Sequence, residues 1–166
     1  MGNEVEWTRN IPVKYRPDIL IIGGGIAGVS AACAAALTGQ QVMLIEYFGV
    51  MGGNATIGGV GSFCGHTKGQ GEVFDTIISE LEKYEAIAPY VADSSTARVF
   101  NHEILAVVLQ ELLQERGVKV LLHTRFIDAI VQDGNIKVCL ICGKSGLEAI
   151  CAKQYIDCTG DGEVAY

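Results

Sequence analysis

Short apolar runs alternate with helix-like stretches in the first part of the chain. Asp18–Ile22 and Gln41–Ile45 have the length of strands and are mostly apolar, which is typical of strands buried on both faces. Between them, the alanine-rich stretch Ile26–Thr38 predicts a helix that ends at Gly39, because glycine commonly follows the last residue of a helix. Strand, helix and strand in this order predict a β-α-β unit with parallel strands.

Two amphipathic helices are expected further along the chain. Apolar residues spaced four apart predict a helix over Val73–Tyr84. The same spacing predicts a second helix from His102 to about Glu115, with Asn101 as its N-cap. The apolar run Val118–Leu122 then predicts another buried strand.

The last part of the chain has the pattern of a β-meander. Three strand-like segments are separated by the short turns 133–134 and 143–146, namely Arg125–Gln132, Asn135–Cys142 and Leu147–Ala152. A final strand is predicted over Lys153–Cys158. We therefore expect an α/β fold with a parallel sheet and a three-stranded β-meander. Residues 1–17 are predicted to be an irregular lead-in, and residues 18–166 to form one domain.

Composition and charge narrow the function classes. The chain has 166 residues, 49% of them hydrophobic, and 21 glycines, several of them in a loop over residues 49–71. Such a composition excludes a disordered chain and indicates backbone packed closely against a ligand. The formal net charge is −7 and no basic run is present, which is evidence against nucleic-acid binding and against an anionic membrane surface.

The cysteines and the N-terminal segment predict a cytoplasmic protein. The first ten residues do not resemble a secretory signal, so the six cysteines are expected to be reduced. Cys139 and Cys142 have a spacing that suggests zinc, but they lie in a predicted strand and would point to opposite faces, so no metal is expected. The apolar stretch Ile19–Leu37 is interrupted by glycines, and we expect no membrane span.

A glycine motif points to a nucleotide. Gly23, Gly25 and Gly28 match G-x-G-x-x-G between the first strand and the first helix, and Glu46 ends the next strand. The first glycine permits a tight turn, the second lets a pyrophosphate approach the backbone, and the third lets helix and strand pack closely. Glu46 would accept hydrogen bonds from ribose hydroxyls, which favours FAD or NAD over NADP.

Two further segments carry a family resemblance. Glu46–Gly58 resembles the pattern E-[RY]-x-G-x-x-G-G-x-x-T-x-G, and Ile156–Gly162 resembles I-D-A-T-G-D-G. On these motifs the chain is similar to the N-terminal part of FAD-dependent oxidoreductases with a glutathione-reductase-like FAD-binding fold. The resemblance speaks against a simple NAD-binding domain, which needs neither segment. One departure is Tyr47, where arginine is common.

The resemblance implies a set of FAD-binding residues. Gly23, Gly25, Ile26, Ala27 and Gly28 would surround the pyrophosphate, and Glu46 would hold the adenosine ribose. A second group would lie along the pyrophosphate, the ribityl chain and the flavin: Gly52, Gly53, Asn54, Ala55 and Thr56. Phe126 would flank the adenine through its backbone, and Thr159 and Gly160 would close over the cofactor.

The same resemblance implies that residues 18–166 are the first, incomplete half of a Rossmann-like FAD-binding domain that lacks the substrate domain. We expect an FAD-dependent oxidoreductase whose flavin accepts a hydride or electrons from a small organic substrate. The resemblance leaves two possibilities: these residues are a fragment of a longer protein, or a second polypeptide completes the site and forms a hetero-oligomer. The alternative is a non-catalytic flavin-binding subunit or fragment that acts only in assembly with a partner chain.

Catalytic residues are not identified by the sequence. His66 is a candidate for acid–base work, because histidine titrates near neutral pH and lies in the glycine-rich loop. Cys64 is a candidate redox group, although no second cysteine lies two or three residues away.

Overall fold

The computed structural model describes residues 6–65, 67–91 and 97–165. Its centre is a parallel sheet of four strands in the order β10-β2-β3-β6. These strands are β2 (Ile19–Ile22), β3 (Val42–Ile45), β6 (Lys119–Leu121) and β10 (Gln154–Asp157). Every one of them was predicted as a strand, the first three from their apolar runs, and the parallel β-α-β arrangement of β2 and β3 is confirmed.

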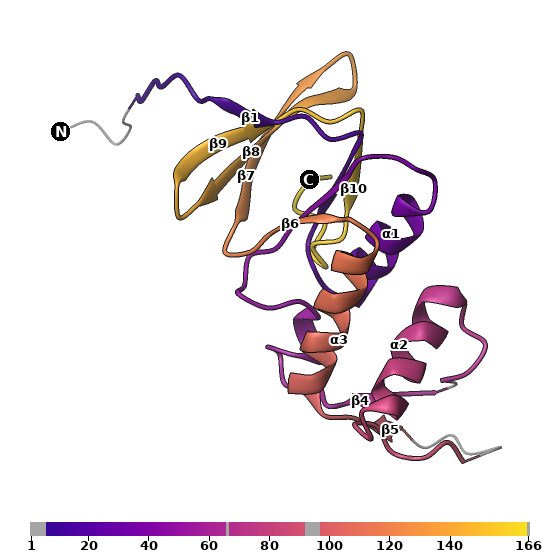
Figure 1. Ribbon diagram of the computed structural model, residues 1–166. Helices are drawn as coiled ribbons and strands as arrows, with labels where there is room; N and C mark the ends of the chain where they lie inside the picture. Colours follow the sequence, from indigo (N-terminus) through magenta and orange to yellow (C-terminus); the bar gives the residue numbers. More distant parts are fainter. Residues whose placement is uncertain (1–5, 66, 92–96, 166) are drawn as a thin grey trace.

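Three helices lie on one side of this sheet: two of them contact its strands, and the third packs against those two (Figure 1). They are α1 (Ile26–Ala36), α2 (Glu72–Lys83) and α3 (His102–Glu115), close to the predicted bounds. Their apolar sides form one core with Ile21 of β2 and Leu44 of β3. Among the described residues, no helix is long and apolar enough to cross a membrane.

A second sheet packs on the opposite face of the parallel sheet. Its strand order is β1-β9-β8-β7, with β7 (Arg125–Gln132), β8 (Asn135–Gly143) and β9 (Gly146–Ile150) forming the antiparallel meander that the sequence predicted. The prediction of an irregular lead-in over residues 1–17 is wrong for β1 (Val13–Tyr15), which pairs in parallel with β9. Because β1 has three residues, two of them exposed, its own pattern does not mark it as a strand.

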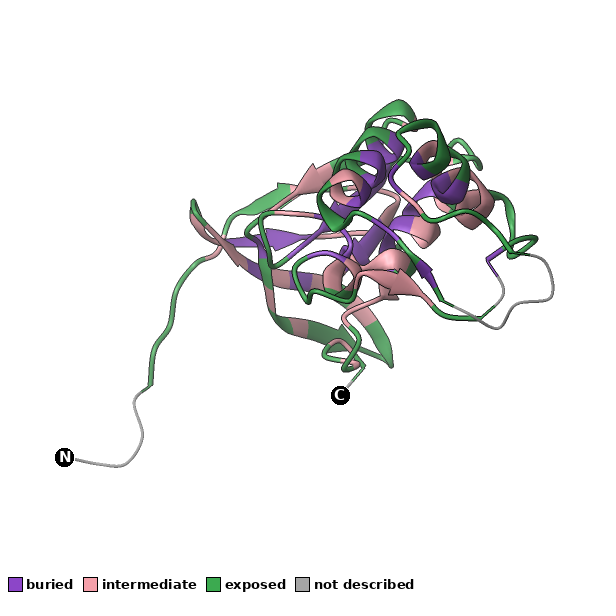
Figure 2. Cartoon of the chain, turned by 90° about the horizontal axis from the view of Figure 1, so that it is seen from below, coloured by how far each residue is buried: buried purple, intermediate pink, exposed green. Residues whose placement is uncertain are grey.

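Alternation along β2 explains how one strand serves two cores. Leu20 and Ile22 face the meander, where they pack with Cys139 and Ile150, whereas Ile21 faces the helices. Successive side chains of a strand point to opposite faces, so an unbroken apolar run is what a doubly covered strand requires. The buried residues accordingly lie along the centre of the molecule in Figure 2.

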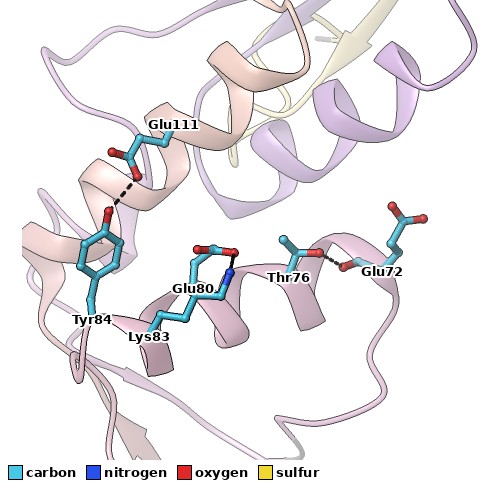
Figure 3. Close-up of polar contacts among 6 residues, drawn as sticks. All are labelled: Glu72, Thr76, Glu80, Lys83, Tyr84 and Glu111. Carbon is cyan, nitrogen blue, oxygen red and sulfur yellow. Dashed lines mark hydrogen bonds and ion pairs between the residues drawn. The ribbon is translucent and has the colours of Figure 1, made fainter.

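The glycine-rich loop and the segment before α3 are more ordered than their sequences indicate. β4 (Ser62–Phe63) pairs antiparallel with β5 (Arg98–Val99), and Gly53–Ala55 forms a turn of 3₁₀ helix. Polar contacts then connect α2 and α3 (Figure 3): the hydroxyl group of Tyr84 donates to Glu111 Oε2 at 3.2 Å. Figure 3 also shows the ion pair between Lys83 and Glu80 on the exposed side of α2.

Candidate nucleotide-binding site

A cleft of about 1040 Å³ opens where β2 and β3 end and α1 begins. Its volume is at the upper end of the range of roughly 300–1,000 Å³ that is usual for ligand pockets. The carboxyl edge of a parallel sheet is where α/β folds bind nucleotides, because strand ends and helix N-termini meet there. The sheet therefore places the cleft where the glycine motif predicts a ligand.

Most of the predicted site residues line this cleft. They come from four segments that are far apart in the sequence: Gly23, Gly25, Ile26, Ala27, Glu46, Gly52, Gly53, Asn54, Ala55, Phe126, Thr159 and Gly160. Gly28 and Thr56 are not in the lining. A Cβ on Gly28 would overlap the Gly23 carbonyl oxygen, so this residue permits close packing of α1 on β2. Thr56 is buried, and its hydroxyl group donates to the Met51 carbonyl oxygen at 2.7 Å.

The first turn of α1 borders the cleft with an open backbone. Gly25 precedes the helix in an extended conformation, with φ −64° and ψ 179°, and carries no side chain that could cap it. A Cβ at Gly25 would meet no protein atom within 4 Å. The N–H groups of a first helical turn have no partner inside the helix and attract anions. The absent side chain thus leaves room for a phosphate group at this helix terminus.

The Gly52–Ala55 segment lies directly against the glycine turn. The Gly52 N–H donates to the Gly24 carbonyl oxygen at 2.7 Å, and Gly25 and Gly52 form a parallel bridge. A Cβ on Gly53 would lie 3.2 Å from the Gly25 Cα. The two backbones are therefore in contact, and a side chain at Gly53 would press against Gly25.

Glu46 is a buried carboxylate at the end of β3. Its exposed fraction is 5%. Oε2 accepts the Gly24 N–H at 2.6 Å, and Oε1 accepts the Phe48 N–H at 2.6 Å. A carboxylate has about four acceptor positions, so each oxygen retains one for a ligand hydroxyl group. Glu46 thus holds the glycine turn in place and still faces the cleft.

The turn after β10 closes the opposite wall. Asp157 accepts the Thr159 N–H at 3.0 Å, the Thr159 hydroxyl at 2.8 Å and the Val164 N–H at 3.0 Å. Burial alone would raise the pKa of Asp157, but these hydrogen bonds together lower it below its ordinary value. The ionised Asp157 therefore fixes the turn that carries Thr159 and Gly160.

Several residues of the cleft were not predicted from the sequence. Phe63 and Phe74 both line the cleft, with ring centroids 5.1 Å apart in an edge-to-face arrangement. Phe74 belongs to the apolar side of α2, and the pattern of that helix does not distinguish core from cleft. Tyr47, a member of the family motif, and Arg125 also line the cleft. The only sequence signal for Arg125 is its place beside Phe126.

The structure tests only one of the two catalytic candidates. His66 lies outside the described residues. Cys64 is exposed and is not among the residues that line the cleft, although its neighbour Phe63 is.

The family model that matches this chain is described as "FAD dependent oxidoreductase" and covers residues 18–166. The chain belongs to this family. FAD is the cofactor of FAD dependent oxidoreductases, and the open helix terminus and the buried acid suit its pyrophosphate and ribose.

Curated relatives of this FAD dependent oxidoreductase match over short segments. Cinnamate reductase of Clostridium sporogenes is 41% identical over 63 residues, which are 38% of this chain and 10% of the relative. The tRNA uridine 5-carboxymethylaminomethyl modification enzyme MnmG of Zymomonas mobilis is 36% identical over 88 residues, which are 50% of this chain and 12% of that protein. The chain thus aligns with about a tenth of the length of these relatives.

Solved structures share the fold. A geranylgeranyl bacteriochlorophyll reductase-like protein of Thermoplasma acidophilum has a TM-score of 0.67 at 20% identity, over 90% of this chain and 41% of the other. The flavin-dependent brominase Bmp2 has a TM-score of 0.68 at 18% identity, over 88% of this chain and 39% of the other. At these identities the likeness establishes the Rossmann-like architecture.

Proposed function

We propose that this chain holds FAD in the cleft between β2, α1 and β3 as part of an enzyme that transfers a hydride or electrons from a small organic substrate. The observation that carries this proposal is the position of Gly25. It lines the cleft at the N-terminus of α1, and a Cβ there would point into space that no protein atom fills. Bound FAD would supply the redox chemistry of the enzyme, which amino-acid side chains do not provide.

The residues of the chain would position the cofactor. The first turn of α1 and the backbone of Gly52–Ala55 would bind the pyrophosphate from two sides, because their backbones meet at Gly25. Glu46 would accept the ribose hydroxyls with its remaining lone pairs, and the turn at Thr159 and Gly160 would cover the cofactor.

We further propose that additional polypeptide completes the site and forms the substrate domain. Exposed apolar side chains support this proposal: Ile57 and Val60 on the cleft loop are 55% and 51% exposed, and Val99 on β5 is 61% exposed. The much greater length of the curated relatives supports it as well. The six cysteines, all free in this structure, suit the reducing cytoplasm.

The test is FAD binding by the purified protein and its Gly25→Ala variant. The wild-type protein should take up FAD and show the absorption bands of a bound flavin. The variant should bind FAD roughly tenfold or more weakly, because a forced steric overlap costs about 1–3 kcal/mol. Its fold should persist, since the added methyl group meets no protein atom.

Gly61→Ala is the matched control. Gly61 is a glycine just before β4 that does not line the cleft, and its Cβ would lie at an ordinary 3.8 Å from the Phe100 carbonyl oxygen. This variant should bind FAD as the wild type does. A wild-type protein that binds no FAD would overturn the proposal. The native mass of the same preparation shows whether a further polypeptide is bound to this chain. A preparation that contains this chain alone and still turns over substrate would contradict the proposal of a further polypeptide.

A further inference from the structure

We propose that a second cavity, beside α2, binds a small organic carboxylate with an apolar or aromatic body. This cavity has a volume of about 450 Å³ and lies between one side of α2, the loop before that helix and the segment that leads into α3. Among the described residues, none lines both this cavity and the nucleotide cleft. Its volume is within the range of roughly 300–1,000 Å³ that is usual for ligand pockets.

Arg98 of β5 is the group that points to an anion. Its side chain is only 6% exposed, and it lines the cavity. Nε donates to the Ala88 carbonyl oxygen at 2.8 Å, and Nη2 donates to Glu82 Oε1 at 2.8 Å. A guanidinium group has five N–H donors, so three of them have no partner among the described residues. These donors are available to a ligand in the cavity.

The ion pair with Glu82 leaves the charge of Arg98 incompletely compensated. The Glu82 side chain is 52% exposed, whereas that of Arg98 is almost fully buried. Water therefore solvates much of the carboxylate but little of the guanidinium group, and a buried charge is unfavourable unless its partners replace the lost water. A ligand carboxylate on the remaining N–H groups would supply that compensation, because its two oxygens match the planar fork of a guanidinium group.

Lys68 provides a second positive charge in the lining. Its Nζ lies 5.4 Å from the centroid of the Tyr90 ring, and no carboxylate of the described residues forms an ion pair with it. Asp75, the other carboxylate that lines the cavity, is engaged by the backbone of the loop: Oδ1 accepts the Gly69 N–H at 2.9 Å and the Gln70 N–H at 3.3 Å. The ammonium group of Lys68 is therefore available to pair with a ligand carboxylate.

Two further residues of the lining favour an apolar body on the ligand. Ile78 is 6% exposed and borders the cavity, and Tyr90 presents an aromatic ring that is 43% exposed. An apolar side chain and an aromatic ring bury apolar or flat groups favourably. We therefore expect aromatic and branched monocarboxylates to bind better than inorganic anions.

The experiment is a calorimetric titration of the purified protein, together with any polypeptide that copurifies. The probes are benzoate, 3-methylbutanoate, benzamide and inorganic phosphate. The two carboxylates should bind. Benzamide has the shape of benzoate without its charge and should bind about tenfold or more weakly, because the charge-assisted hydrogen bonds are lost. Phosphate has no apolar body and should also bind more weakly than benzoate.

Three results of this titration would overturn the proposal. They are the failure of both carboxylates to bind, equal affinity for benzoate and benzamide, and equal affinity for benzoate and phosphate. The first would remove the site, the second would remove the role of the charged groups, and the third would remove the role of the apolar walls.

Two variants locate the bound carboxylate. Arg98→Gln should weaken benzoate about tenfold or more, and Lys68→Gln about two- to fivefold, because the lysine charge is exposed to water. Arg116→Gln and Lys83→Gln are the matched controls. Both of these residues form ion pairs with glutamates of α2, and neither lines the cavity. The controls should bind benzoate with wild-type affinity.

Thermal unfolding of each variant checks that it is folded. Lys68→Gln keeps the test decisive if Arg98→Gln does not fold, because Lys68 is exposed. Benzoate affinity that stays at the wild-type value in Lys68→Gln and in a folded Arg98→Gln would overturn the assignment of the site.

The carboxylate site does not depend on the proposed function. Because the two linings share no described residue, saturating benzoate should leave the affinity for FAD unchanged. Displacement of FAD by benzoate would place the carboxylate in the cleft and overturn the separate site. Protein that binds benzoate but no FAD would retain this site and overturn the proposed function.

Discussion

A single residue, Glu46, connects three backbone segments of the cleft. It accepts N–H groups from Gly24 and Phe48 through different oxygens, and its own carbonyl oxygen accepts the Thr124 N–H. One bond joins the glycine turn to the end of β3, one holds the loop that follows β3, and one joins the loop before β7. The residue that is expected to bind the ribose therefore also supports the fold when no ligand is bound.

This double role predicts that Glu46→Gln lowers stability in the absence of FAD. An amide has one acceptor oxygen, so its NH₂ group would face a backbone N–H and leave that donor buried without a partner. We expect a loss of about 1–3 kcal/mol in the free energy of unfolding at neutral pH. Urea unfolding of the cofactor-free protein measures it. Glu115→Gln, on the exposed side of α3, should change stability by less than about 0.5 kcal/mol. Equal stability of the two variants would contradict the role of Glu46.

The sequence predicts those site residues whose role depends on a local motif. Gly25 and Glu46 were predicted from their spacing after two apolar strands, and the structure brings both to the cleft. Phe63, Phe74 and Arg125 were not predicted, because they reach the cleft only through the packing of separate elements. The spacing of apolar residues identifies the apolar face of a helix or strand, but it does not identify the element or cleft against which that face packs.

At the level of elements, the turn after β10 depends on one charge. The hydrogen bonds to Asp157 lower its pKa, so the ionised form is favoured in the folded state. A group with a lowered pKa stabilises the fold fully above its ordinary pKa, about 3.9 for aspartate, and that stabilisation is lost as the pH falls through the folded value.

Asp157→Asn should therefore lower the thermal unfolding midpoint at pH 7. The difference from the wild type should shrink as the pH falls below about 4, because the wild-type carboxylate is then protonated as well. Thermal unfolding of the cofactor-free protein over this pH range measures both effects. Asp161→Asn, an exposed position on the same turn, serves as the control and should show a small difference at every pH. A difference that grows towards acid pH would contradict the assignment.

Helices and strands with a clear apolar periodicity or a capping residue were predicted closely, whereas the short strands that lack such a pattern were missed. Asn101 accepts the Glu103 and Ile104 N–H groups at 2.9 and 3.2 Å, as expected of an N-cap. β1 exists because β9 offers it a hydrogen-bonding edge, and β4 exists because β5 does the same. Strands of two or three residues have no periodicity to recognise, so only the folded chain reveals them.

The whole molecule has two cores that share one sheet. Ile21 packs against the helices and Leu20 against the meander, although they are neighbours on β2. The apolar runs predicted a sheet covered on both faces. Which elements cover which face follows from the three-dimensional path of the chain, and the meander could not be assigned to its face from alternation alone.

Two cysteines report on the two cores separately. Cys33 lies in the helical core and Cys139 in the meander core, and both are fully buried. Burial raises the pKa of Cys33 and raises that of Cys139 to about 12, so neither thiol is ionised at neutral pH. A buried neutral thiol reacts with alkylating reagents only after the structure around it opens.

Alkylation in increasing urea should label Cys33 and Cys139 over the same concentration range. Strand β2 contributes to both cores, so neither core keeps its packing after the other is lost. Quantifying the modified peptides by mass spectrometry measures each site, and the exposed Cys64 provides a reference that reacts without urea. Labelling of Cys139 at much lower urea than Cys33 would show that the meander unfolds on its own. In that case Phe126 and Arg125, which the meander carries to the cleft, would be positioned independently of the sheet.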